Sequence, residues 1–257
     1  MHEATENLVR LGYLAKAAVY LLVGTLAFRV AAGLQGGRLT DPGGSLYVIL
    51  RQPFGRALII AIAAGLLTYA AWRIVGALLG WQRQPYSGWG KRSLTIIRAL
   101  VYGAVGWKAA RLAAGLRGGD SGPEPLVRTA MEWPLGEWLI IAAGLGVGWY
   151  GLVQINDARK GRLEPDLDAS TLRHRAGAWA HSVARAGIGA RGVILVLLAY
   201  GIVRAAIEHS PSEAGGMGTS LQLLNALPQG TLLLAATAAG LFAYGVYQLL
   251  HARYAHL

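Results

Sequence analysis

Basic side chains recur at matched positions inside the most apolar parts of this sequence. Lys16, Arg98 and Arg191 occupy equivalent places in three similar segments, each six residues after another arginine. At 1.5 Å per helical residue, six residues correspond to about 9 Å, so each base lies inside its apolar segment. Cations held at this depth of a membrane are suited to bind phosphate headgroups or another anion.

Tyrosines and further polar residues accompany these bases. Tyr20 and Tyr102 stand one helical turn after Lys16 and Arg98. A second apolar segment follows each segment with a basic residue, and it carries a tyrosine expected at a similar depth. A polar residue follows this tyrosine one turn later, in the pairs Tyr69 and Arg73, Tyr150 and Gln154, and Tyr244 and Gln248. Together these residues form a candidate ligand-binding site. The alternative is that the bases snorkel to the headgroups while the tyrosines only pack the helices.

Six apolar stretches position these residues. They cover Leu11–Ala32, Phe54–Leu79, Leu94–Leu116, Leu135–Ile155, Ile188–Ile207 and Thr231–Leu250. Each reaches the roughly 20 residues that cross about 30 Å of hydrocarbon. Apolar residues make up 54% of the 257-residue chain and charged residues only 14%, which is too little charge to coat a soluble globule. The sequence therefore predicts an all-α integral membrane protein with six transmembrane helices in a single domain, 1–257.

The chain repeats itself. Of 22 aligned positions, 13 are identical between the segments that begin at Lys16 and at Arg98. A proline–glycine–tyrosine pattern recurs in all three second helices, which gives repeats over residues 8–80, 90–158 and 182–254. Each repeat has two spans, so all three enter the membrane from the same side. Such parallel repeats predict pseudo-threefold symmetry about the membrane normal.

Charge predicts the orientation. The side that holds both chain ends carries 15 of the Lys and Arg residues and the other side nine, so both termini should be cytoplasmic. The net charge of +11 flanks the apolar runs rather than gathering in one arm, which argues against a nucleic-acid partner and leaves membrane lipids, anionic phospholipid among them. The sequence contains no cysteine, so it forms neither disulfides nor cysteine-ligated metal sites.

Short apolar segments lie between the two spans of each repeat, and we expect them to form short helices at the outer surface. A further helix is expected to lie on the cytoplasmic membrane surface, with Leu172, Ala176, Trp179 and Val183 at helical spacing.

Other motifs do not support catalysis. Gly146, Gly148 and Gly151 match a dinucleotide-binding spacing but lack the preceding strand. All histidines, His251 among them, are expected in loops or at helix ends. Haem bound between transmembrane helices would need histidine ligands inside the spans, so these histidines do not indicate a haem site. We expect no enzyme activity, no cofactor and no metal site.

The three copies of this pattern, especially GARGVI and QPFGRALI followed by GLLTYAAWR, resemble the bacterial membrane proteins of domain-of-unknown-function family 1206. The resemblance covers essentially the whole chain and implies a protein of the bacterial inner membrane, without an activity. The third copy departs most, because Leu195 replaces the tyrosine of Tyr20 and Tyr102.

Three functions remain open. The first is non-enzymatic binding of anionic lipid or a small anion at the candidate site. The second is a transporter or channel that uses the pseudo-threefold axis, although the middle of the bilayer is nearly all Ala, Gly, Leu, Ile and Val. The third is a structural partner for another membrane complex.

Overall fold

The regular secondary structure in the described part of the chain consists of helices. A computed structural model describes residues 2–51, 54–79, 89–116, 123–163 and 177–254, and no strand occurs among them. The long helices are α1 (His2–Ala31), α3 (Gly55–Leu79), α4 (Trp89–Ala113), α6 (Gly136–Lys160), α8 (Ala178–Ile207) and α10 (Gly230–Tyr254). The short ones are α2 (Pro42–Leu50), α5 (Glu124–Met131), the 3₁₀ turn η1 (Pro211–Glu213) and α9 (Met217–Ala226).

Five of the six expected spans are confirmed as helices long and apolar enough to cross a membrane. They cover Arg10–Ala31, Gly55–Gly76, Gly136–Lys160, Trp179–Ile207 and Gly230–Arg253. The sixth expected span falls in α4, which has 25 residues but is not among these five, as judged on its described residues. Five basic residues along α4 lower its hydropathy, so its crossing of the membrane stays a prediction.

The three short apolar segments form the helices α2, α5 and α9, as predicted, and the second long helix of each repeat begins close to the end of the short helix before it. This close approach explains the recurring glycines Gly55, Gly136 and Gly230. A Cβ on Gly55 would lie 2.1 Å from the carbonyl oxygen of Ile49, and one on Gly136 would lie 1.7 Å from that of Ala130. No side chain fits there, so the glycine is a steric requirement of the turn.

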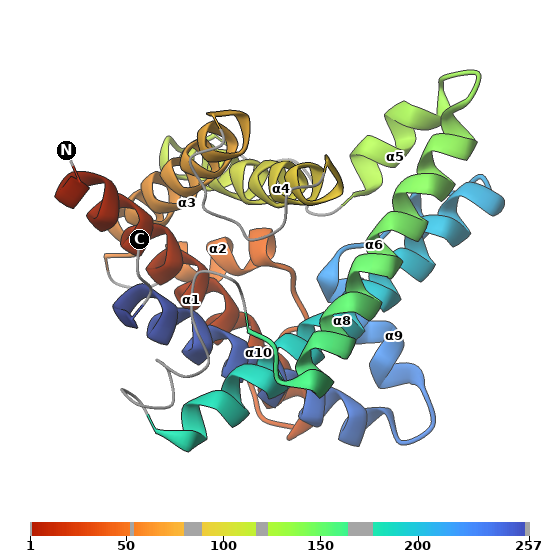
Figure 1. Cartoon of the computed structure of the whole chain (residues 1–257). Coiled ribbons are helices and arrows are strands. Elements are labelled where there is room, and N and C mark those ends of the chain that lie inside the picture. Colours follow the sequence, from red (N-terminus) through yellow and green to blue (C-terminus); the bar gives the residue numbers. More distant parts are fainter. Residues whose placement is uncertain (1, 52–53, 80–88, 117–122, 164–176, 255–257) are drawn as a thin grey trace.

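The long helices pack in the order α4, α3, α1, α10, α8, α6 (Figure 1). The second helix of each repeat packs against the first helix of another repeat, in the pairs α3 with α4, α6 with α8 and α10 with α1. The two helices of the first repeat also pack together, as do those of the third. Among the described residues α4 and α6 lack such packing, so the row of helices is open at the second repeat.

Glycines show where the second repeat differs. Gly65 of α3 approaches Leu11 of α1, and Gly240 of α10 approaches Ala190 of α8. Their equivalent in α6, Gly146, has no neighbouring atom within 4 Å of an added Cβ. The sequence offers a reason for the missing contact between α6 and α4. In α4, Leu94 stands at the position that is Gly12 or Gly187 in the first helices of the other repeats.

One expected element is corrected. Trp179 and Val183 lie in the first turns of the long helix α8, so they do not belong to a separate surface helix. Leu172 and Ala176 lie outside the described residues. The helix is continuous from Ala178 into the apolar span and ends at Ile207.

Candidate functional site

Lys16 lies inside a cage of aromatic rings. Its side chain is 2% exposed, although it carries a charge in an apolar span. The ammonium nitrogen lies 3.5 Å from the ring centre of Tyr69, 4.1 Å from that of Tyr102 and 5.2 Å from that of Tyr13. Ring faces attract a cation, by about 2 kcal/mol or more when water is excluded. The rings of α3, α4 and α1 therefore help to balance this charge.

Arg191 occupies the equivalent place in the third repeat and is 8% exposed. Its guanidinium carbon lies 5.3 Å from the ring centre of Tyr244 and 5.7 Å from that of Tyr150. One of its terminal nitrogens donates a hydrogen bond of 3.4 Å to the Tyr150 hydroxyl. As with Lys16 and Tyr69, the base meets the tyrosine on the second helix of its own repeat.

Tyrosines connect the surroundings of the two bases. Tyr69 and Tyr102 meet edge to face at 5.6 Å, and Tyr20 and Tyr244 do so at 4.8 Å. The side chains of Tyr20 and Tyr102 also interact. The result is one connected group, buried except for the half-buried Tyr150, which we call the tyrosine–cation cluster: Lys16, Arg191, Tyr20, Tyr69, Tyr102, Tyr150 and Tyr244. The predicted residues thus converge between repeats, rather than forming one separate site within each repeat.

The two tyrosine pairs lie at equivalent contacts between repeats. We call such a contact, between the second helix of one repeat and the first helix of another, a joint. In each, the second-helix tyrosine packs against the first-helix tyrosine of another repeat. At the third joint, between α6 and α8, the sequence pairs Tyr150 with Leu195. Here the Tyr150 hydroxyl accepts a hydrogen bond from Arg191.

The polar residues one turn beyond the second-helix tyrosines are buried but differ in their bonding. Arg73 donates hydrogen bonds of 3.1 Å to the hydroxyls of Tyr69 and Tyr13. Gln248 is 0% exposed, and neither its amide nitrogen nor its oxygen has a hydrogen-bond partner among the described residues. The Gln154 amide nitrogen is in the same condition. An unsatisfied buried amide costs about 1–3 kcal/mol, which makes these two residues candidates for contact with a ligand.

Sequence reasoning missed two members of the buried network. His251 lies in the last turn of α10, at a helix end as predicted, but it is fully buried and its ring stacks on that of Tyr13 at 4.2 Å. Tyr13 also meets Tyr69 and accepts the hydrogen bond from Arg73. The search relied on recurrence, and the second and third repeats have Thr95 and Ile188 where the first has Tyr13. The signal that remained was the spacing of Tyr13 from Tyr20 on one helical face.

Arg98 is the one predicted site residue whose side chain lies outside the described part; its backbone belongs to α4. Among the residues whose burial is described, the buried charged side chains are Lys16, Arg73 and Arg191, with no carboxylate. Guanidinium, ammonium and phenol groups are hydrogen-bond donors, and bonds from a cationic donor to an anion are roughly twice as strong as neutral ones. The arrangement is suited to bind an anion.

Long apolar helices around a buried polar cluster define a multi-pass helical membrane protein. The chain belongs to the family described as Domain of Unknown Function (DUF1206), whose model matches residues 11–80, 95–161 and 186–255. The three matches establish the threefold repeat. The chain is also 30% identical over 250 residues to the uncharacterized protein YxxB of Bacillus subtilis (strain 168), covering 96% of this chain and 90% of that protein. No solved structure matches it.

Proposed function

We propose that this chain is a non-enzymatic protein of the bacterial inner membrane that binds a small anion at the tyrosine–cation cluster. The observation that carries the proposal is the charge of the buried interior. Arg191 is buried, and its contacts among the described residues are with the rings and hydroxyl of tyrosines. Charged side chains inside a membrane are costly and are usually paired with an opposite charge, so an anion bound beside Arg191 would balance its charge.

The binding position we propose lies beside Arg191. Tyr150 and Tyr244 contact the guanidinium group, and Gln154 and Gln248 follow one helical turn along the same two helices. Their unsatisfied amide groups would donate to an anion held next to Arg191. An anionic lipid headgroup has the same phosphate chemistry, but the burial of Arg191 favours a small free anion.

Thermal unfolding of the purified protein tests this proposal, with tryptophan fluorescence as the signal. Phosphate should raise the unfolding temperature relative to gluconate at equal ionic strength, because a ligand at 100 times its Kd stabilises the folded state by about 2.7 kcal/mol. Arg191→Gln should abolish the increase, whereas the exposed Arg38→Gln should keep it. An equal phosphate effect in both variants, or none in the wild type, would show that the cluster does not bind the anion.

The alternative of a channel along the pseudo-threefold axis has less support. Such a path needs polar or hydrated surface through the bundle. Tyr20 and Tyr102, which sit at equivalent positions of two repeats, instead interact with each other, and their rings are buried. A structural role beside another membrane protein has no specific observation in its favour.

A further inference from the structure

The outward face of α8 carries a groove that shares no residue with the tyrosine–cation cluster. It lies between α6 and α8 and has a volume of about 420 Å³. Ile155, Gly189 and Val193 contribute its apolar part, whereas Ser182, Arg159 and Arg185 line its polar end. This polar end lies where α6 finishes and α8 begins, which we call the basic end of the bundle.

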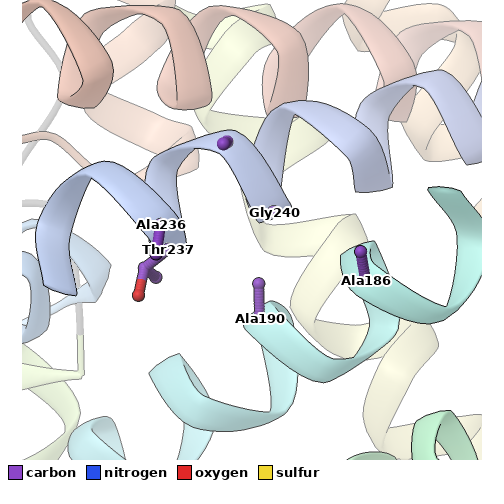
Figure 2. A pocket seen from close by; sticks show the side chains of 6 residues that line it. Ala186, Ala190, Ala236, Thr237 and Gly240 are labelled. Carbon is purple, nitrogen blue, oxygen red and sulfur yellow. The ribbon is translucent and has the colours of Figure 1, made fainter. Parts of the chain in front are cut away.

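A second hollow adjoins the first on the other side of α8. It measures about 410 Å³ and lies between α8 and α10. Figure 2 shows Ala186 and Ala190 of α8 near Ala236, Thr237 and Gly240 of α10. Ala186 lines both hollows, so they form two apolar channels on either side of one helix. Small side chains on both helices leave this space open.

One of the two arginines that line the first groove is held at its mouth by hydrogen bonds. Arg185 donates hydrogen bonds of 2.8 Å to the carbonyl oxygen of Ala158 and 3.1 Å to that of Arg159. These bonds cap the last turn of α6 and fix the guanidinium group beside the groove. Arg159 is exposed at the same end. Among the described residues, no carboxylate lines either hollow, so the described lining of the mouth carries positive charge only.

The length of the groove matches one leaflet of a bilayer. Ser182 and Val193 are eleven residues apart, which corresponds to about 16 Å along a helix. The hydrocarbon core is about 30 Å thick, so one leaflet contributes about half of that. An acyl chain that follows the groove from the basic end therefore fits its extent.

We infer that the outward face of α8 binds an anionic phospholipid, with its phosphate at Arg159 and Arg185 and its acyl chains in the two hollows. Basic pockets between transmembrane helices at the membrane surface are suited to lipid headgroups, and the apolar hollows add a place for the tails. This inference is independent of the proposed anion site, because none of the cluster residues lines the hollows.

Two variants separate the headgroup from the tail. Arg159→Gln removes an exposed charge without removing the Arg185 cap, and it should weaken binding of phosphatidylglycerol about fivefold. Gly189→Leu places a side chain inside the groove, where an added Cβ meets only the Cβ of Ala158 at 3.5 Å. It should reduce the phosphatidylglycerol bound to the protein at least as much.

Matched controls use the same substitutions elsewhere. Arg162→Gln changes an exposed arginine that does not line the groove, and Gly146→Leu adds the same side chain to an open face of α6. Native mass spectrometry of the protein in mixed micelles with phosphatidylglycerol or phosphatidylcholine measures the bound lipid. Loss of phosphatidylglycerol in the two groove variants alone is expected. Equal loss in the controls, no loss, or equal retention of both lipids would overturn the inference.

Discussion

At the scale of single residues, the main feature is a lysine whose charge is stabilised by aromatic rings. The ammonium group of Lys16 lies over Tyr69 and Tyr102, and the Tyr69 hydroxyl also accepts a hydrogen bond from Arg73. Tyr69 thus contributes twice, through its ring face and through its hydroxyl. These contributions can be separated by substitution.

Tyr69→Phe and Tyr69→Leu should differ in stability. Phe keeps the ring face beside Lys16 but loses the bond from Arg73, which should cost about 1–3 kcal/mol. Leu loses the ring as well, which should add about 2 kcal/mol. The exposed Tyr200 of α8 provides the control, since Tyr200→Leu should change stability by less than about 0.5 kcal/mol. Chemical unfolding in detergent measures all three, and equal losses for Phe and Leu at position 69 would exclude a role for the ring face.

The two buried glutamines lead to the opposite expectation. Gln248→Met and Gln154→Met remove amides that lack partners among the described residues, so without an anion they should leave stability unchanged or raise it by about 1 kcal/mol. They should also reduce the phosphate effect on unfolding temperature. A large loss of stability in gluconate would mean that these amides are satisfied by water.

The residues of the cluster were predictable to the extent that they recur. Lys16, Arg191 and their tyrosines stand at equal spacing in similar segments, and this spacing predicted a common depth for them. Tyr13 and His251 could not be found in this way, because the residues in contact differ from one joint of the bundle to the next. Tyr13, for example, is replaced by Thr95 and Ile188 in the other repeats. Which helix faces meet depends on packing between segments far apart in the chain, and periodicity in one segment does not contain that information.

At the scale of helices, glycines decide where backbones approach and where the chain turns. The sequence showed that Gly55, Gly136 and Gly230 recur after a proline. The reason that only glycine fits is visible in the structure, where a carbonyl oxygen of the preceding short helix lies in the space that a Cβ would need. The lack of packing between α4 and α6 could not be predicted from the recurring residues either. The glycine on α6 is retained as Gly146, but α4 has Leu94 where the first helices of the other repeats have glycine.

Two glycines of the same helix should therefore respond differently to alanine. Gly136→Ala places a Cβ 1.7 Å from the carbonyl oxygen of Ala130, and we expect a loss of several kcal/mol or failure to accumulate folded protein. Gly146→Ala meets no atom within 4 Å and should be neutral or stabilising by up to about 1 kcal/mol. Yield and thermal unfolding compare the two. Similar stability of both variants would contradict the turn geometry.

At the scale of the whole molecule, helix order and charge lead to predictions about symmetry and orientation. Contacts between the first helix of one repeat and the second helix of another recur around the bundle. We predict that a density map of the protein will show three repeats that superpose by rotations of about 120° around one axis normal to the membrane. The gap between α4 and α6 is the main departure from this symmetry. A pair of repeats in opposite orientations would contradict it.

Orientation follows from the excess of basic residues on one side. Reporter fusions at Met1, Gly88 and Leu257 should report the cytoplasm, and those at Gly43 and Gly216 the opposite side. The fusion at Gly88 is the most informative, because it also requires α3 to cross the membrane. A periplasmic signal there would reverse or break the proposed topology.

The most direct test of the central claim is a density map of the protein in lipid discs, prepared in phosphate. Binding of a small anion predicts tetrahedral density about 3 Å from the Arg191 guanidinium group, within reach of Tyr150 and Gln248, and its absence from a map of Arg191→Gln. Side chains that close directly over Arg191, with no density beside it in phosphate, would contradict the claim that this cluster binds an anion.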